Sequence, residues 1–235
     1  MLTLFILLST LFADANQQYA DGNYAEAASM YEQVLQENPA AEVYYNLGNA
    51  RFKQGELAQA ILAYERCLRL NPRMKDARHN LEFAESRIKD NIRDTNTFFL
   101  RKWYLAVRNS LSEGTWAWIS VLCFVLFLAG MLLFALSRIV AVRKAAFYLS
   151  LVLLVVSALS LMHTLGLHHR DTAREEAIIT QGIVNAKSSP DRSGTDLFTV
   201  HEGTKVTIKE TLGEWCRIHV GNYDGWIRLS NAERI

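Results

Sequence analysis

Side chains that could do chemistry are few in this sequence and lie far apart. The three cysteines, Cys67, Cys123 and Cys216, fall in three different segments, and no Cys-x-x-Cys pair is present. His201 and His219 stand in short apolar stretches without an evident nucleophile beside them. The sequence also lacks a glycine-rich phosphate loop and a nucleophile elbow, the local patterns of nucleotide-binding and hydrolytic sites. We therefore predict a protein that is not an enzyme and that holds no metal and no cofactor.

The charges are balanced in number but uneven in placement. The 235-residue chain has 25 basic and 24 acidic side chains, which give a formal net charge of +1. Nucleic-acid-binding proteins generally carry a basic excess, so we predict no nucleic-acid partner. Residues 115–137 and 145–167 contain no Asp, Glu, Lys or Arg, whereas the parts before and after them are charge-balanced. This distribution predicts two soluble parts joined by apolar helices.

The two uncharged stretches are candidates for membrane spans. Each has 23 residues, and at about 1.5 Å per residue a helix of that length crosses the hydrocarbon core of a bilayer. The loop between them, residues 138–144, carries only basic charges, which favours the cytoplasmic side. The aromatic-rich residues 94–114 predict a linker helix lying in the membrane interface. The alternative for this linker is an ordinary helix packed on the preceding domain.

The N-terminus indicates the orientation of these spans. Residues 1–15 contain an apolar stretch about as long as a signal-peptide core and end in Ala13-Asp14-Ala15, an A-x-A cleavage pattern. The usual basic residues at the start are missing, so either the true start lies upstream or the signal is atypical. An exported N-terminus followed by two spans places both soluble parts on the same outer side. We therefore predict a protein of the bacterial inner membrane with both soluble domains in the periplasm.

The first soluble part contains an internal repeat. Residues 22–39 align with residues 55–72 at an offset of 33, and residues 78–84 echo residues 44–50 at an offset of 34. Small alanines let two helices approach closely, and the Asn-Pro pair that closes each unit ends its second helix. We therefore predict paired helices capped by a single last helix. The identical positions include Gly22/Gly55, Ala27/Ala60, Tyr31/Tyr64, Glu32/Glu65, Leu35/Leu68 and the Asn-Pro pairs that end at Pro39 and Pro72.

The unit at residues 41–74 resembles the tetratricopeptide repeat. The residues at its expected positions are Tyr44, Leu47, Gly48, Ala60, Tyr64 and Pro72, with Cys67 in place of the usual alanine. The resemblance implies a concave groove that binds peptides or protein segments. The residues that the repeat pattern directs toward this groove are Asn16, Tyr19, Tyr45, Asn46, Asn49, Phe52 and Lys53. An asparagine amide can donate to a bound backbone and a lysine can meet an acidic group, but Asn46 and Asn49 can equally satisfy groups of their own helices.

The second soluble part has a different pattern, of short apolar stretches separated by turn residues. The predicted strands are 177–186, 196–201, 205–210, 215–220 and 225–228. Several short strands in so small a segment favour a small closed barrel over a sandwich.

Four segments of this part resemble the bacterial SH3 domain: residues 184–190, 202–206, 213–218 and 225–227. In that family such domains bind cell-wall peptides or dock onto other proteins. We predict that Trp215, Tyr223 and Trp226 form an exposed aromatic surface for a ligand. The alternative is that one of the two tryptophans belongs to the core.

The order of the segments resembles the BatE-type members of the Bat (Bacteroides aerotolerance) family over nearly the whole chain. The most telling parts are residues 44–50, 98–118, 187–191 and 203–206. The resemblance implies two kinds of partner, membrane-anchored von Willebrand factor A-domain proteins and a MoxR-type AAA+ ATPase. It also implies a role in envelope integrity or stress.

The predicted fold is a multi-domain membrane protein with an all-α repeat domain, a two-helix transmembrane hairpin and a small all-β SH3-like barrel. We predict a non-catalytic scaffold of the inner membrane that recruits protein partners. The alternative is an envelope sensor or anchor whose barrel binds peptidoglycan. The predicted segments are a signal-like segment 1–15, repeats 16–93, linker helix 94–114, first span 115–137, cytoplasmic loop 138–144, second span 145–167, linker 168–176 and barrel 177–235.

Overall fold

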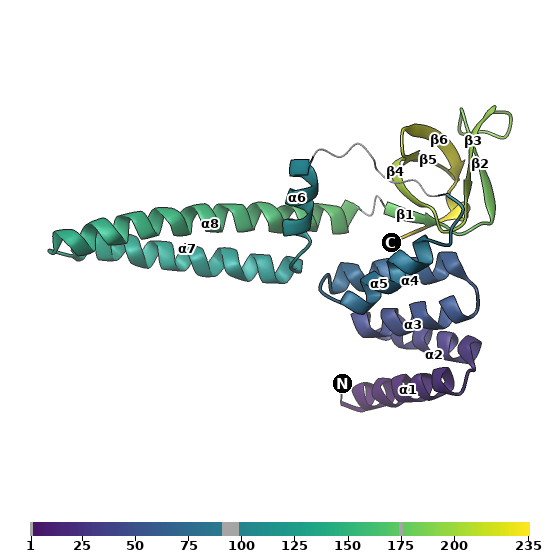
Figure 1. The fold of residues 1–235 in the computed structure, drawn as a ribbon, viewed down its shortest axis with the longest axis horizontal. Coiled ribbons are helices and arrows are strands. Elements are labelled where there is room, and N and C mark those ends of the chain that lie inside the picture. The colour runs from purple at the N-terminus through teal and green to yellow at the C-terminus, as the bar shows by residue number, and fades with distance from the viewer. Residues whose placement is uncertain (1, 91–98, 174–175) are drawn as a thin grey trace. The chain divides into compact units, whose positions relative to one another are not determined.

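The computed structural model describes residues 2–90, 99–173 and 176–235, which form two compact units (Figure 1). The first unit combines the N-terminal helices with the C-terminal sheet, although these are far apart in the sequence. The second unit contains the helices of residues 99–173. We call residues 2–90 the repeat domain and residues 176–235 the β-domain.

The repeat domain consists of two helix pairs followed by a single helix, as predicted. Gly22 and Gly55 lie in the turns within the two pairs, each with a φ of 84°, a conformation that favours glycine. Gly48 is needed for another reason, because a Cβ atom there would lie 2.5 Å from the ring of Tyr64. The helices are α1 (Leu2–Ala20), α2 (Tyr24–Glu37), α3 (Ala41–Lys53), α4 (Leu57–Leu70) and α5 (Lys75–Glu85).

Helix α1 runs without interruption through the boundary that the sequence placed after residue 15. Ala15 is fully buried in the core of the first helix pair. The side chain of Phe12 packs on the same core, with its ring centroid 6.0 Å from that of Tyr31. The segment before the predicted cleavage site therefore contributes packing to the first repeat, and the signal peptide stays a prediction.

The β-domain is a single antiparallel sheet with the strand order β3-β2-β6-β5-β4-β1-β7. The predicted closed barrel is not confirmed, because the sheet is open between β3 and β7. Arg66 of α4 donates to the backbone carbonyl of Arg234 in β7 at 2.6 Å, so a helix side chain rather than a further strand satisfies this carbonyl of the edge strand. The strands are β1 (Glu176–Ile179), β2 (Ile183–Lys187), β3 (Asp196–His201), β4 (Lys205–Leu212), β5 (Trp215–Val220), β6 (Tyr223–Arg228) and β7 (Ala232–Arg234).

One strand prediction was wrong, and one strand was missed. The expected strand 177–186 is two strands, because the chain turns at residues 180–182 and β1 and β2 pair with different neighbours. The last strand, β7, was not predicted. It has only three residues, follows the short 3₁₀ helix Leu229–Asn231, and exists because it pairs with β1, which lies more than fifty residues earlier in the chain.

A shared apolar core joins the two domains of the first unit. Ile61 of α4, Ile178 of β1 and Ile235 are buried in one cluster. Gly203 lies against the same cluster, because a Cβ atom added at this glycine would lie 2.5 Å from Ile88 Cγ2. On the last helix, α5, the buried residues are Ala77, Leu81 and Ala84. The β-domain covers part of this end of the repeat array, and we call these contacts the joint.

The second unit contains two long apolar helices and a short one. They are α6 (Phe99–Arg108), α7 (Glu113–Leu136) and α8 (Val140–Ala173). The helices α7 and α8 are long and apolar enough to cross a membrane. In the most apolar 18-residue stretch of each helix, only 6% of α7 and 22% of α8 is buried. A helix in the core of a soluble protein would be mostly buried instead. Residues 94–98 of the predicted linker helix lie outside the described residues.

The predicted boundaries of the spans differ from the observed helices. Helix α7 begins at Glu113 because Ser112 caps it, accepting from the backbone nitrogen of Thr115 at 3.4 Å. Helix α8 begins at Val140, so most of the predicted loop 138–144 is helical. The helix also extends through residues 168–173, which the sequence assigned to a linker.

Small residues hold α7 and α8 together as a hairpin. The hydroxyls of Ser120 and Ser157 each donate to the other residue's carbonyl, at 3.1 and 2.9 Å. At Gly130 a Cβ atom would collide with the hydroxyl of Ser150. Close approach through small residues is typical of helices that associate within membranes.

Candidate functional site

Two equivalent hydrogen-bond networks organise the predicted groove. In the first network, Asn16 Oδ1 accepts from Tyr31 Oη at 2.7 Å and from Asn46 Nδ2 at 2.9 Å. One repeat later, Asn49 Oδ1 accepts from Tyr64 Oη and from the amide of Asn80, both at 2.8 Å. Both lone pairs of each asparagine carbonyl are thus used within the repeats.

These networks favour a structural role for the three predicted asparagines. Asn46 donates to Asn16 across helices, and the carbonyls of Asn16 and Asn49 each join three helices. The Nδ2 groups of Asn16 and Asn49 take no part in these bonds and remain donors at the groove. Burial raises the pKa of both tyrosines, that of Tyr31 to about 12, so the phenols stay protonated donors. Asn80 was missed, although its offset of 34 from Asn46 gave a signal.

Two aromatic rings and one guanidinium lie together at one end of the groove. The ring of Phe52 lies 5.6 Å from that of Phe83 in α5, centroid to centroid. The guanidinium of Arg87 lies over both rings, 4.6 Å from Phe83 and 5.6 Å from Phe52. Cation–π contact of this kind holds the charge in place while leaving it able to pair with an acid.

Phe83 and Arg87 were not among the predicted groove residues. A signal existed, because the offset of 34 that relates the third unit to the second aligns Arg87 with Lys53. Both basic side chains are exposed. Among the described residues neither makes an ion pair, and Arg87 lies against the faces of two aromatic rings.

The other predicted groove residues lie elsewhere. Tyr19 stacks edge-on against Tyr24, with ring centroids 5.3 Å apart, at the start of the array. Tyr45 lies in the middle, 6.3 Å from the ring of Tyr64, and is half-buried. The structure therefore spreads the predicted aromatic residues along the repeat domain.

A separate cleft of about 800 Å³ lies between α2, α3 and α4, away from the predicted groove residues. Its charges are paired with one another. Arg51 contacts Glu32 at 2.5 Å and Glu56 at 2.6 Å, and Arg66 contacts Glu233 of β7 at 2.9 Å. Because the paired charges satisfy one another, this cleft offers less to a charged ligand than the groove does.

The predicted aromatic surface of the β-domain separates into two places. Trp215 and Trp226 lie on the outer face of β5 and β6, because their neighbours Cys216 and Ile227 point into the core. Trp215 pairs across the strands with Arg228, and Trp226 pairs with Arg217. Neither tryptophan is fully buried. Tyr223 instead contacts Phe198, with ring centroids 5.6 Å apart.

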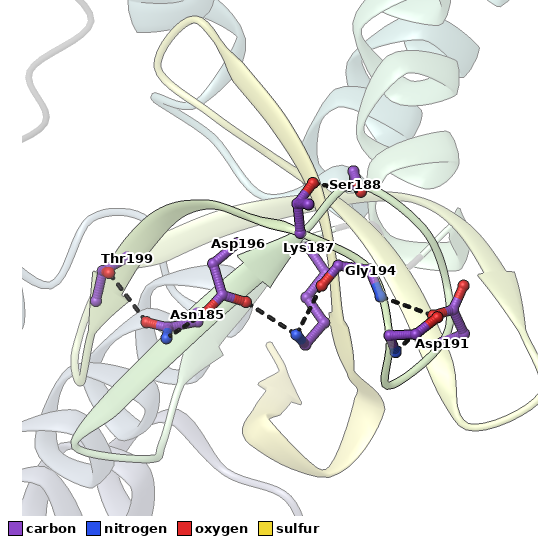
Figure 2. A network of polar contacts seen from close by, with 9 residues as sticks. Asn185, Lys187, Ser188, Asp191, Gly194, Asp196 and Thr199 are labelled. Atoms are coloured by element: carbon purple, nitrogen blue, oxygen red, sulfur yellow. Dashed lines mark hydrogen bonds and ion pairs between the residues drawn. The ribbon is translucent and has the colours of Figure 1, made fainter.

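A polar network fixes the loop between β2 and β3 (Figure 2). The ammonium of Lys187 donates to the Gly194 carbonyl and to Asp196 Oδ1, each at 2.9 Å. Asp191 accepts from the backbone nitrogen and hydroxyl of Ser193 and from the Gly194 nitrogen, each at 2.7 Å. The hydrogen bonds from Ser193 and its neighbours lower the pKa of Asp191 to about 2. Both carboxylates are thus occupied by contacts within this part of the β-domain.

The polar part of the joint surrounds the shared apolar core. Lys205 of β4 lies 2.9 Å from Glu65 of α4 and 3.2 Å from Glu176 of β1. Arg69 of α4 donates to the backbone carbonyl of Ile235. Because α4 and α5 carry both the joint and part of the groove, the groove and the β-domain are held in one body.

No side-chain cluster within residues 2–90, 99–173 and 176–235 has the composition of a metal site. The cysteines are also separate: Cys67 and Cys216 are buried as free thiols, and Cys123 is a free thiol in α7. Burial raises the pKa of Cys67 to about 12 and that of Cys216 to about 11, which leaves both as unreactive thiols at neutral pH.

Comparison with known proteins agrees with two parts of this architecture. No curated protein matches the chain. Residues 41–74, which form α3, α4 and the turn after them, match the family model of the tetratricopeptide repeat. Residues 183–232, from β2 to the start of β7, match the family model of the bacterial SH3 domain. The chain is thus similar to these two families on either side of a pair of long apolar helices.

Proposed function

We propose that the protein is a non-catalytic, membrane-anchored scaffold that recruits a protein partner through the groove of its repeat domain. The observation that carries this proposal is the end of the groove, where the guanidinium of Arg87 lies over Phe52 and Phe83. Lys53 follows Phe52 in the chain and is exposed, and within the described residues neither cation makes an ion pair. Such a surface complements a segment that presents an acidic side chain next to an aromatic or aliphatic one.

Reversing one charge in the groove tests this function. Lys53→Glu in the full chain is expected to lower recovery of the partner by about tenfold in affinity purification from solubilised membranes. Lys75→Glu is the matched control, because it makes the same charge change at the exposed start of α5. Equal recovery of the partner with the wild type, Lys53→Glu and Lys75→Glu, at unchanged circular dichroism, would rule out the groove as the binding surface.

The membrane anchor is supported by the exposure of α7 and α8, whose apolar side chains need a nonpolar solvent. We infer that the chain lies in a bacterial inner membrane with both soluble domains in the periplasm, since the short turn of the hairpin carries only basic charges. An alkaline phosphatase fused after residue 175 is expected to be active. An inactive fusion of normal abundance would reverse this orientation.

The arrangement of the segments supports a more specific partner set. A Bat-type complex would supply membrane-anchored von Willebrand factor A-domain proteins and a MoxR-type AAA+ ATPase, with a role in envelope integrity or stress. Mass spectrometry of the proteins recovered with the full chain tests this set directly. If neither class of protein is recovered but another protein binds the wild type and not Lys53→Glu, the scaffold function stands. The Bat-type complex is then excluded.

A second function, binding of peptidoglycan, is favoured by the outer face of β5 and β6. There Trp215 and Trp226 alternate with Arg228 and Arg217 across the two strands. Aromatic rings suit sugar faces, and guanidinium groups suit the carboxylates of wall peptides. The full chain is expected to sediment with purified peptidoglycan if this face binds the wall.

A pair of variants separates binding by this face from unspecific adhesion. Trp226→Ala should abolish sedimentation, whereas Tyr223→Ala, which alters the separate contact with Phe198, should not. If both variants behave as the wild type, the β-domain does not use these aromatic residues to bind the wall.

A further inference from the structure

A small cleft opens at the turn of the α7–α8 hairpin. It has a volume of about 290 Å³ and lies between the last turns of α7 and the first turns of α8. Aromatic side chains and two cations surround it. The lining residues are Phe134, Val140, Arg143, Lys144, Phe147 and Tyr148.

Aromatic rings in tilted and edge-on contact form the wall of this cleft. Phe134 of α7 contacts Phe147 of α8 with ring centroids 5.6 Å apart, and Phe147 contacts Tyr148 at 5.6 Å. The guanidinium of Arg143 lies 5.3 Å from the centre of the Phe134 ring. This contact holds one cation at the rim of the cleft, beside an apolar wall.

The two cations have no acidic partner in the second unit's hairpin turn. The sequence contains no Asp or Glu between Glu113 and Asp171. Glu113 begins α7, so at 1.5 Å per residue it lies about 30 Å along the helix from Phe134. Within the described residues, Arg143 and Lys144 make no ion pair. An anion at this cleft would therefore meet two positive charges that no described acidic side chain compensates.

We propose that the cleft binds the phosphate of an anionic phospholipid. Arg143 and Lys144 contact the phosphate oxygens, with geometry that guanidinium and ammonium groups commonly offer to phosphate. The rings of Phe134 and Phe147 lie against the start of the acyl chains. The apolar wall selects a lipid over inorganic phosphate, and basic pockets at helix ends are typical sites for such headgroups. This inference rests on the proposed membrane anchor.

Lipid retention by the full chain tests the proposal. The protein is incorporated into nanodiscs with equal parts phosphatidylglycerol and phosphatidylcholine, extracted in mild detergent, and examined by native mass spectrometry. Phosphatidylglycerol should be retained in preference to phosphatidylcholine. Arg143→Gln should reduce this preference by about fivefold, the effect of one basic residue near an anionic surface.

Arg138→Gln is the matched control, because it removes the same charge from the same turn but from a residue that does not line the cleft. It should leave the preference unchanged, and Phe134→Ala should reduce it without any change of charge. An equal loss in Arg138→Gln and Arg143→Gln would overturn the site in favour of general attraction. Displacement of the lipid by inorganic phosphate would also overturn it.

A separate measurement distinguishes failure of the site from failure of the anchor. Wild-type protein should stay in the membrane pellet after carbonate extraction. Retention in the pellet without any preference for phosphatidylglycerol would overturn the lipid site alone. Release by carbonate would overturn both the anchor and the site.

Discussion

Asp90 Oδ2 lies 2.6 Å from the backbone nitrogen of His201, and Asp90 Oδ1 lies 2.8 Å from the imidazole Nδ1 of the same residue. The hydroxyl of Thr204 donates to Asp90 Oδ2 at 3.0 Å. One carboxylate of the repeat domain therefore accepts from a turn of the β-domain 111 residues later. This contact makes the joint sensitive to a single charge.

Asp90→Asn is expected to weaken the joint by about 1–3 kcal/mol, because the neutral amide replaces a carboxylate that accepts from two residues. Hydrogen exchange of the full chain should accelerate at the backbone amide of His201 and in neighbouring peptides. Glu82→Gln in α5 is the control for loss of one negative charge. Equal exchange in wild type and Asp90→Asn would show that this carboxylate does not hold the joint.

The same contact predicts a dependence on pH. Burial raises the pKa of Asp90, but hydrogen bonds from His201 and Thr204 outweigh this effect and hold the pKa below its ordinary 3.8. The ionised carboxylate therefore stabilises the joint fully above that pH, and its contribution is lost as the pH falls through the lowered pKa. The ratio of His201 exchange rates between Asp90→Asn and wild type should approach one in acid. A ratio that stays constant across this range would contradict the assignment.

Gly203 tests the apolar part of the joint. It has a φ of 82°, and an added Cβ would lie 2.5 Å from Ile88 and 3.2 Å from Ile61. Gly203→Ala should therefore destabilise the first unit by about 2 kcal/mol or more, from backbone strain and overlap together. Gly213→Ala is the matched control, because its φ is 58° and nothing lies within 4 Å. The difference between the two variants in the free energy of unfolding in urea measures the overlap with Ile88 and Ile61. Equal losses in both variants would mean that backbone strain alone causes the effect.

The repeated networks predict equal losses in the two helix pairs. Tyr31→Phe and Tyr64→Phe should each lower the free energy of unfolding by about 1 kcal/mol, because each removes one donor from an asparagine carbonyl. Tyr44→Phe serves as the control for loss of a hydroxyl in the same domain. Denaturant unfolding followed by circular dichroism provides the comparison. A loss at only one of Tyr31 and Tyr64 would show that the two networks are not equivalent.

The hairpin is expected to be intolerant of bulk at Gly130. Gly130→Val should destabilise the packing of α7 on α8 by about 1–3 kcal/mol, because the side chain would overlap Ser150. At Gly114 a Cβ atom meets nothing within 4 Å, so Gly114→Val supplies the control at the start of the same helix. Unfolding in mixed micelles, followed by tryptophan fluorescence, distinguishes them. Similar curves for both variants would mean that α7 and α8 do not pack at this point.

Regular local patterns made much of the architecture predictable. The offset between Tyr31 and Tyr64 revealed the helix pairs, because each repeat packs its own small and aromatic residues in the same way. The uncharged stretches revealed α7 and α8, since length and apolar character are properties of single segments. The residues 202–206 likewise marked the hairpin that begins β4.

Other features of the candidate site depended on partners far away in the chain. The predicted asparagines could be placed near the groove from the sequence. Only the fold showed that the side-chain carbonyls of Asn16 and Asn49 accept hydrogen bonds from neighbouring helices. Phe83 and Arg87 were overlooked, although the third unit repeats the positions of the second. Their importance comes from contact with Phe52, which the alignment alone does not reveal.

The sequence by itself determined the kinds of elements in this protein: repeated helices, two apolar helices and a set of short strands. Tertiary structure decided that the β-domain rests on α4 and α5, that the sheet stays open beside Arg66, and that Asp90 meets His201. The physical reason is the range of the interactions. Helix periodicity and apolar length are set by neighbours in the chain, whereas the joint depends on side chains more than a hundred residues apart, which only the folded chain brings together.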